Sequence, residues 1–258
     1  MARSLRYALG SLLRRLTPRD PFDSLVSDKK ALIDFAFRKF NIKSFADLGG
    51  VWAVDGGYTF YALDRYPIEK AFLVDTDFTD KVIERKSAYT ALQLIAGNFG
   101  SAETVERIGD VDAVILFDTL LHQVNPDWDS VLELYARHAY CFLILNQQFT
   151  GAERTVRLLD LGEDEYFRNV PHTRTEEPYK SVFQKMYEIH PQHNRIYRDI
   201  HNIWQWGITD DDLITRLNSL GFKLQLYKNA SSFSFSESPG QIRTLPNFEN
   251  HAFVFSNR

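Results

Sequence analysis

The chain has 258 residues, of which 44% are hydrophobic and 25% are charged, and its formal net charge is -4. This length suits one α/β domain with a modest addition, and the apolar fraction excludes wholesale disorder. Because both signs of charge are interspersed, there is no electrostatic case for nucleic acid as a partner. No apolar run approaches the roughly 18 residues of a membrane span. The single cysteine, Cys141, lies in an apolar run, which favours a reducing, cytoplasmic location.

The amino-terminal segment 1–20 combines arginines with a stripe of leucines. Its apolar centre is too short, and its arginines too many, for a signal peptide. We expect a helix that packs on its own domain or covers a site, with contact to a membrane surface through residues 1–20 as the alternative. Residues 27–40 then read as a helix with Ser27 as its N-cap. Together these segments predict a helical addition over residues 1–43.

The stretch 44–80 reads as a strand, a glycine-rich turn, a helix and a second strand that ends in an acid. The first strand stops at Gly49-Gly50, a second glycine pair follows at 56–57, and the pattern is helical from Tyr58 to Tyr66. The second strand covers 71–74 and places Asp75 at its carboxyl end. Glycines let the backbone approach a ligand, and an acid beyond the next strand can accept hydrogen bonds from ribose hydroxyls. The stretch therefore predicts a nucleoside site with an irregular turn.

Three more strands alternate with helical segments, at 92–96, 111–117 and 140–145. This alternation predicts a parallel sheet with helices on both faces, and the fifth strand delivers three amides to its carboxyl edge. Residues 150–207 are polar and aromatic and break the alternation, so we expect them to form a cap over that edge. A helix follows, with Thr209 as N-cap and Gly221 as C-cap. Two late strands, joined by a long loop rather than a helix, are expected to pair antiparallel.

Three stretches together resemble the class I S-adenosylmethionine-dependent methyltransferases, over residues 44–258. They are Asp47-Leu48-Gly49 with the later 56–59, the segment 112–124, and the segment 206–222. The resemblance implies a Rossmann-like, seven-stranded, mostly parallel sheet with an antiparallel last strand, helices on both faces, and S-adenosyl-L-methionine as the cofactor. The chain departs from the family between Gly49 and Tyr58, where its turn is longer.

The resemblance also implies roles for individual residues. Asp47 would order the turn and the methionine amino group, and Asp75 would bind both ribose hydroxyls. Asp118 and Thr119 would lie beside the methionine moiety and the transferred methyl group. The full expected cofactor-binding set is Asp47, Gly49, Gly50, Gly56, Gly57, Tyr58, Asp75, Thr76, Asn98, Phe99, Asp118 and Thr119, of which Asn98 and Phe99 would contact the adenine.

On the acceptor side, His122 stands close to the predicted edge, and an unperturbed pKa near 6.5 suits a general base. The alternative is a histidine that only packs in its loop. The cap histidines match no compact metal-ligand spacing, so we expect no metal. The substrate-binding candidates are the three amides Asn146, Gln147 and Gln148 and the cap residues His201, Trp204 and Trp206.

The sequence thus predicts an enzyme that transfers a methyl group from S-adenosyl-L-methionine to a small-molecule acceptor, with oxygen as the favoured acceptor atom. Two other classes are compatible with the same turn. One is a methyltransferase-like domain that binds or assembles without catalysis, which the irregular glycine turn keeps open. The other is a nicotinamide-dependent oxidoreductase, against which the absence of GxGxxG and the antiparallel finish argue.

Overall fold

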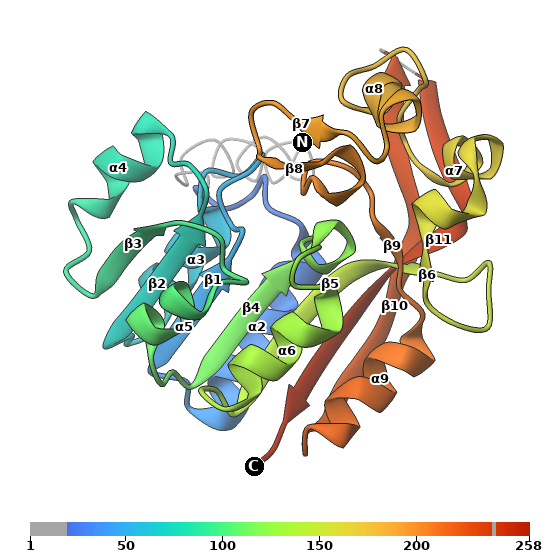
Figure 1. Ribbon diagram of the computed structural model, residues 1–258. Coiled ribbons are helices and arrows are strands. Elements are labelled where there is room, and N and C mark those ends of the chain that lie inside the picture. Colours follow the sequence, from blue (N-terminus) through green and yellow to red (C-terminus); the bar gives the residue numbers. More distant parts are fainter. Residues whose placement is uncertain (1–19, 239–240) are drawn as a thin grey trace, which may run out of the picture.

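Seven strands form one mixed sheet at the centre of the molecule (Figure 1). The computed structural model describes residues 20–238 and 241–258, so the helix expected in the first 19 residues and its membrane contact lie outside the described residues. The strands are β1 (Ser44–Leu48), β2 (Lys70–Asp75), β3 (Leu92–Ala96), β4 (Ala113–Phe117), β5 (Cys141–Phe149), β10 (Lys223–Ser238) and β11 (Gln241–Ser256).

These strands lie in the order β3-β2-β1-β4-β5-β11-β10. Strands β1 to β5 run parallel to their neighbours, whereas β11 enters antiparallel between β5 and β10. The chain order reverses between β1 and β4, and ligands of open α/β sheets bind outside the carboxyl ends of the strands at such a switch point. The predicted Rossmann-like sheet with an antiparallel last strand is confirmed.

Helices cover both faces of the sheet because each central strand sends alternate side chains to opposite faces. In β4, Ile115 packs on one face, and Val114 and Leu116 pack on the other. One face is covered by α2 (Ser27–Phe40), α3 (Gly57–Arg65) and α4 (Asp80–Lys86). The other is covered by α5 (Ala102–Ile108), α6 (Trp128–Ala136) and α9 (Asp210–Ser219), which lie in front of the sheet in Figure 1. No helix among the residues described could span a membrane.

Polar caps start several of these helices. The hydroxyl of Thr209 accepts a hydrogen bond from the amide of Asp212, so this predicted N-cap is confirmed, and the hydroxyl of Ser101 caps α5 in the same way by accepting from the amide of Thr104. The predicted C-cap at Gly221 is displaced by one residue, because Leu220 is the C-cap and Gly221 follows it with a φ of +89°. The prediction for Ser27 was wrong. It is the first residue of α2, and the cap position before it makes no side-chain hydrogen bond.

The cap between β5 and α9 is built from short elements that share a separate apolar cluster with the outer half of the β10–β11 hairpin. The predicted long loop between the two last strands was wrong, since both strands extend far beyond the sheet as a hairpin (Figure 1). The alternating serines and phenylalanines from Ser231 onward follow a strand period of two residues. The cap elements are β6 (Val156–Arg157), η2 (Leu158–Leu161), α7 (Glu163–Asn169), α8 (Tyr179–Gln184), β7 (Ile189–His190), β8 (Arg195–Ile196), η3 (Tyr197–Asp199) and β9 (Trp206–Gly207).

Strand β5 is longer than the sequence predicts. Asn146, Gln147 and Gln148 were expected after its end, but they lie within the strand and pair with β11. The reason is long-range. β11 continues alongside β5 beyond Phe117, the last residue of β4, and supplies hydrogen bonds that keep the polar residues extended.

Candidate active site

The turn after β1 brings three segments together at the switch point of the sheet. Gly49 has a φ of +77°, and a Cβ atom placed on it would lie 2.7 Å from Thr119 Cγ2 and 3.6 Å from Phe99 Cε1. Thr119 follows β4, and Phe99 follows β3. The structure therefore gathers the expected residues of three strand ends around one glycine whose missing side chain leaves room for a close approach.

Asp47 is buried beneath this turn, with 1% of its surface exposed. Its carboxylate accepts a hydrogen bond from Thr59 Oγ1 at 2.6 Å, and any side chain at Gly50 would clash with it. Burial raises the pKa of Asp47 to about 6, against the opposing effect of the Thr59 hydroxyl. A carboxylate held in this way is stabilised by any positive group that comes to lie beside it.

The irregular loop 50–55 folds back across the ends of β1 and β2. The amide of Val51 donates to Asp75 Oδ2 at 3.0 Å, and Asp55 accepts from Thr79 Oγ1 at 2.9 Å and from Lys81 Nζ at 3.1 Å. Asp55 itself has a φ of +48°, and Gly56 follows at +69°. The loop is thus tied to the start of α4, while Trp52 at its tip is 87% exposed.

Asp75 lies at the carboxyl end of β2, as predicted. Its second oxygen, Oδ1, accepts from the amide of Thr76 at 2.8 Å. The side chain of Asn98 accepts from the amide of Gly100 at 2.8 Å and so closes its own turn. Phe99 is held by its carbonyl, which accepts from Tyr135 Oη at 2.7 Å. The structure therefore brings Phe99 to the turn around Gly49 and gives Asn98 a turn-forming contact.

Asp118 adopts a left-handed conformation with a φ of +58°. Its carboxylate forms an ion pair with Lys29 of α2 and accepts from Gln147 Nε2 at 2.8 Å. Lys29 was not among the residues predicted for the site. It lies on the buried face of α2, three and four residues before Leu32 and Ile33. This helical spacing was the feature of the sequence that could have shown that Lys29 is buried.

The three amide side chains of β5 alternate between the two faces of the sheet. Gln147 lies on the α2 face, where its Nε2 also reaches Asn250 Oδ1 at 3.2 Å. Asn146 and Gln148 lie on the other face, each 1% exposed. Asn146 Oδ1, both side-chain polar atoms of Gln148, and Thr119 Oγ1 are buried without a hydrogen-bond partner among the described residues. Such groups are rare in folded proteins unless a ligand or water satisfies them.

His122 lies in a short helical turn, η1 (Leu120–His122), directly after the strand-end residues of β4. Its Nδ1 is 2.7 Å from the carbonyl of Ile203 in the cap, which assigns the proton to Nδ1 and leaves Nε2 as the hydrogen-bond acceptor. Burial lowers the pKa of His122, partly offset by this hydrogen bond. The ring is therefore neutral near pH 7 and can accept a proton at Nε2.

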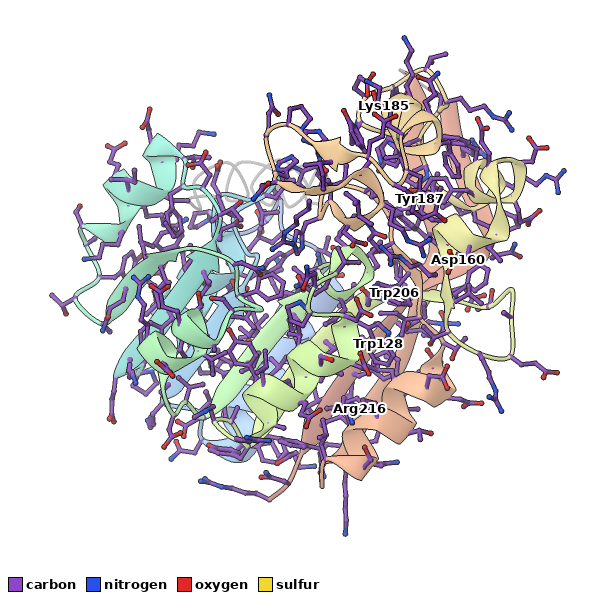
Figure 2. All side chains as sticks on the ribbon, viewed as in Figure 1. Trp128, Asp160, Lys185, Tyr187, Trp206 and Arg216 are labelled. Atoms are coloured by element: carbon purple, nitrogen blue, oxygen red, sulfur yellow. The ribbon has the colours of Figure 1, made fainter. Side chains whose placement is uncertain are left out.

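The three cap candidates have different surroundings. Trp204 is 5% exposed and packs against Phe248, so it belongs to the cap interior. The indole of Trp206 donates to the carbonyl of Gln123 at 2.7 Å and fastens the cap to the loop after β4 (Figure 2). His201 Nε2 lies 2.6 Å from Arg195, and burial, with Arg195, lowers the pKa of His201 to about 4. Within the described part of the chain, no group of three acidic, histidine or cysteine side chains could hold a metal.

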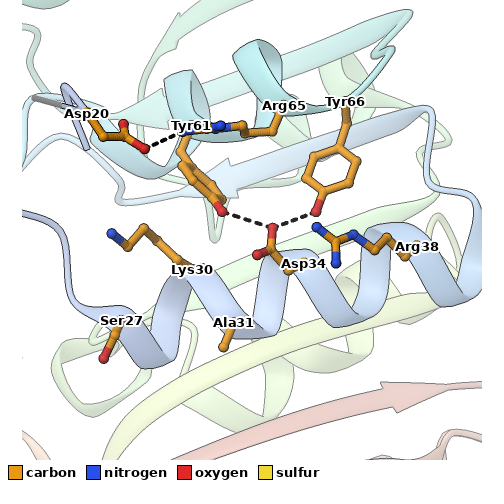
Figure 3. A pocket seen from close by; sticks show the side chains of 9 residues that line it. All are labelled: Asp20, Ser27, Lys30, Ala31, Asp34, Arg38, Tyr61, Arg65 and Tyr66. Carbon is orange, nitrogen blue, oxygen red and sulfur yellow. Dashed lines mark hydrogen bonds and ion pairs between the residues drawn. The ribbon is translucent and has the colours of Figure 1, made fainter. Parts of the chain in front are cut away.

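A pocket of about 520 Å³ lies away from this edge, between α2 and α3 (Figure 3). Asp34 accepts hydrogen bonds from the hydroxyls of Tyr61 and Tyr66 at its base. Burial and this carboxylate raise the pKa of both tyrosines. Lys30 donates to the carbonyl of Phe22 at its rim. None of the predicted site residues lines this pocket.

Comparison with known proteins gives similarity at the level of structure. No protein-family model and no curated protein matches the sequence. The amino-terminal domain of EvdMO1, determined with S-adenosylhomocysteine and D-fucose, is similar with a TM-score of 0.56 and 15% identity, covering 91% of this chain and 85% of that one. The 1,6-didemethyltoxoflavin-N1-methyltransferase of Burkholderia thailandensis has a TM-score of 0.51 and 12% identity, covering 99% and 88%.

A proposed RNA methyltransferase of Pyrococcus horikoshii is similar with a TM-score of 0.50 and 11% identity, covering 93% of this chain and 86% of that one. At these identities the likeness concerns the fold, since one fold serves many acceptors. The order of the seven strands and the antiparallel β11 agree with that likeness. The chain has the Rossmann-like fold of the class I S-adenosylmethionine-dependent methyltransferases.

Proposed function

We propose that the chain is an enzyme that transfers a methyl group from S-adenosyl-L-methionine to a small-molecule acceptor, with oxygen as the acceptor atom. The observation that carries this proposal is the meeting of three segments at the glycine pair after β1, where Thr119 and Phe99 lie beside Gly49 and Asp47 lies beside Gly50. Asp75 stands at the end of the next strand. These positions are the ends of β1 to β4, where this fold binds ligands.

The residues fit the cofactor in three respects. The missing side chain of Gly49 forms a cradle in which Thr119 and Phe99 approach the backbone, and Thr119 Oγ1 is a buried hydroxyl that lacks a partner among the residues described. Asp47 is a buried carboxylate with a raised pKa, which a methionine ammonium group would stabilise in its charged form. Asp75, with Thr76 beside it, would accept from the ribose hydroxyls, and Phe99 would contact the adenine.

The cofactor supplies an electrophilic methyl group on sulfur, so the protein must position the acceptor and remove its proton. Asp118 and Thr119 would border the methyl group. His122 would take the acceptor proton at Nε2, because its Nδ1 proton is engaged with Ile203. Gln147 bonds to Asp118, Trp206 bonds to the carbonyl of Gln123, and His201 lies close enough to His122 to influence it electrostatically, so these three residues would contact the acceptor.

A small-molecule acceptor is supported by two of the similar structures, one determined in the presence of D-fucose and the other with bound 1,6-didemethyltoxoflavin. The weakly negative charge of the chain argues in the same direction, since nucleic-acid binding relies on clustered basic residues. The sequence has a single cysteine, Cys141, which is fully buried, and a reducing cytoplasmic location stays our prediction.

Calorimetry with S-adenosylhomocysteine tests the proposal. We expect binding by the wild-type chain and a loss of about tenfold or more in Asp75→Ala, equal to roughly 1.4 kcal/mol. Asp77→Ala is the matched control, because Asp77 bonds only to the neighbouring amide of Phe78. Absence of binding by the wild-type chain would contradict the proposal.

A binding protein without catalysis is the second candidate, and one observation favours it. The irregular loop 50–55 departs from the family pattern and is fixed to Asp75 by the amide of Val51 and to the start of α4 by Asp55. If the cofactor binds but no acceptor in a broad panel of alcohols, phenols and amines yields S-adenosylhomocysteine, this candidate replaces the enzyme.

A further inference from the structure

Lys29 is the one charged side chain on the buried face of α2. Only 9% of its side chain is exposed, and its ammonium group lies 5.2 Å from the ring centre of Tyr58 and 5.6 Å from that of Phe117. A buried lysine is costly unless a counter-charge accompanies it. Its counter-charge is Asp118, 89 residues later in the chain.

Asp118 is held from several directions. Its amide donates to the carbonyl of Leu145 at 2.8 Å, and its left-handed backbone is a conformation that aspartate tolerates better than most residues. One carboxylate oxygen pairs with Lys29, and the other accepts from Gln147, whose amide is shared with Asn250. A polar row therefore runs from α2 across the ends of β4, β5 and β11.

Of the two charged groups in this row, the carboxylate of Asp118 is the one that solvent can reach, and the ammonium group of Lys29 is covered. The side chain of Asp118 is 36% exposed, whereas the side chain of Lys29 is 9% exposed beneath the two rings. The residue after Asp118 is Thr119, whose Cγ2 fills the space beside Gly49. Asp118 thus stands next to the floor of the proposed cofactor site, with free approach from solvent.

We propose that Asp118 receives the acceptor through a hydrogen bond from an uncharged hydroxyl group next to the one whose proton His122 would take, and that Lys29 is the positioning residue that holds and neutralises this carboxylate. The inference rests on the proposed function and adds the acceptor class to it. Because Lys29 already balances the charge of Asp118, the pair offers a strong acceptor for an O–H group without demanding a cation. An anionic carboxylate in the same place would meet an exposed carboxylate and be repelled.

The rival role for Lys29 is to bind the carboxylate of the methionine moiety. The geometry favours the first role, since the ammonium group is already paired with Asp118 and covered by Tyr58 and Phe117. The two roles predict different results when the charge near the transferred methyl group is probed directly.

Sinefungin is such a probe, because it carries an amine where the cofactor carries its methyl group. Calorimetry of sinefungin and S-adenosylhomocysteine gives the ratio of their affinities. In Asp118→Asn we expect this ratio to fall by about tenfold, since the ammonium group of sinefungin loses its carboxylate. In Lys29→Met we expect it to rise by about tenfold, since Asp118 loses its internal counter-charge and pairs with sinefungin instead. The comparison rests on the ratio of the two affinities, because Asp118 stands beside the proposed cofactor site and its replacement also acts on S-adenosylhomocysteine.

Lys30→Met is the matched control, because Lys30 is the next residue on α2 and, among the described residues, donates only to the carbonyl of Phe22. It should leave both affinities unchanged. If Lys29→Met weakens both ligands equally, Lys29 binds the methionine carboxylate and the inference is overturned. Unchanged ratios in both variants overturn it as well. Should Asp118→Asn fail to fold, the direction of the change in Lys29→Met decides alone, and failure of the wild-type chain to bind S-adenosylhomocysteine points to the proposed function instead.

Discussion

The backbone amide of Val51 donates a hydrogen bond of 3.0 Å to the carboxylate of Asp75. This bond joins the irregular loop after β1 to the end of β2, on the strand that would supply the ribose ligand. The acid expected to bind the ribose therefore also holds the loop that departs from the family pattern. Its two tasks can be separated by experiment.

We expect Asp75→Ala to speed amide hydrogen exchange at Val51, because the amide loses its acceptor. Asp77→Ala should leave that exchange unchanged. The measurement is exchange by NMR or mass spectrometry in the absence of cofactor. Equal protection of Val51 in the wild type and in Asp75→Ala would mean that the loop is held by Asp55 and its contacts to α4 alone.

Asp47 predicts how cofactor binding depends on pH. Burial raises the pKa of Asp47 to about 6, so the carboxyl protonates as the pH falls through that value. We expect the affinity for S-adenosylhomocysteine to fall by up to about tenfold per pH unit below the midpoint, as the methionine ammonium loses its charged partner. Thr59→Val should move the midpoint upward, because the hydroxyl of Thr59 lowers the pKa of Asp47. A flat profile from pH 7 to 5 would exclude contact between Asp47 and the ammonium group.

The surroundings of His251 in the carboxyl-terminal hairpin allow us to predict how the stability of the protein depends on pH. His251 lies 2.8 Å from Asp210 at the start of α9 and 3.0 Å from Glu249 of β11. Burial would lower the pKa of His251, but the two carboxylates outweigh it and the net pKa is raised. A raised pKa means that this contribution to stability is complete below the unfolded pKa, near 6.5, and is lost as the pH rises through the folded pKa.

We therefore expect the Tm of the wild type to fall as the pH rises above about 6.5, and His251→Gln to flatten that part of the profile. His138→Gln is the control, because His138 makes a more exposed contact with Asp110. If the wild type and His251→Gln follow parallel profiles, the cluster around His251 does not titrate on unfolding.

Alanine substitutions at two glycines can distinguish the cost of backbone strain from the effect of a side chain that obstructs the cofactor site. Gly49 and Gly162 both have positive φ, at +77° and +86°, but a Cβ on Gly49 would lie 2.7 Å from Thr119, whereas nothing lies within 4 Å of one on Gly162. Each alanine substitution should cost roughly 1 kcal/mol of unfolding free energy through the left-handed backbone. Only Gly49→Ala should also weaken S-adenosylhomocysteine by about tenfold or more, measured by denaturation and calorimetry in parallel. Equal effects of both variants on cofactor affinity would contradict the cradle at Gly49.

Local patterns were sufficient for the central sheet. Buried runs such as Val114–Leu116 are read directly as strands, and the caps Ser101 and Thr209 follow from their side-chain chemistry. The hairpin beyond Ser231 was not predicted, because serine-rich segments near Pro and Gly read as loops until a partner strand is available. Strand propensity depends on such partners more than helix propensity does.

The sequence predicts those site residues that stand at strand ends. It does not predict the contacts between residues that are distant in the chain. Asp47 and Asp118 follow from position, but the pairing of Asp118 with Lys29 spans 89 residues. The contact of His122 with the carbonyl of Ile203 spans 81 residues. No local pattern contains such pairs, and only the assembled fold reveals which tautomer of His122 is held.

The position of β11 has a consequence for how the chain can fold. β5 is buried along its whole length, and β11 supplies all of its pairing on one side, from Cys141 to Phe149. Until residues 241–256 have been synthesised, that side of β5 is an open apolar edge, the kind of surface that pairs with other chains. The nascent protein thus passes through a stage in which a buried strand of its sheet lacks its neighbour on one side, and a chaperone that shields this edge would raise the yield of folded protein.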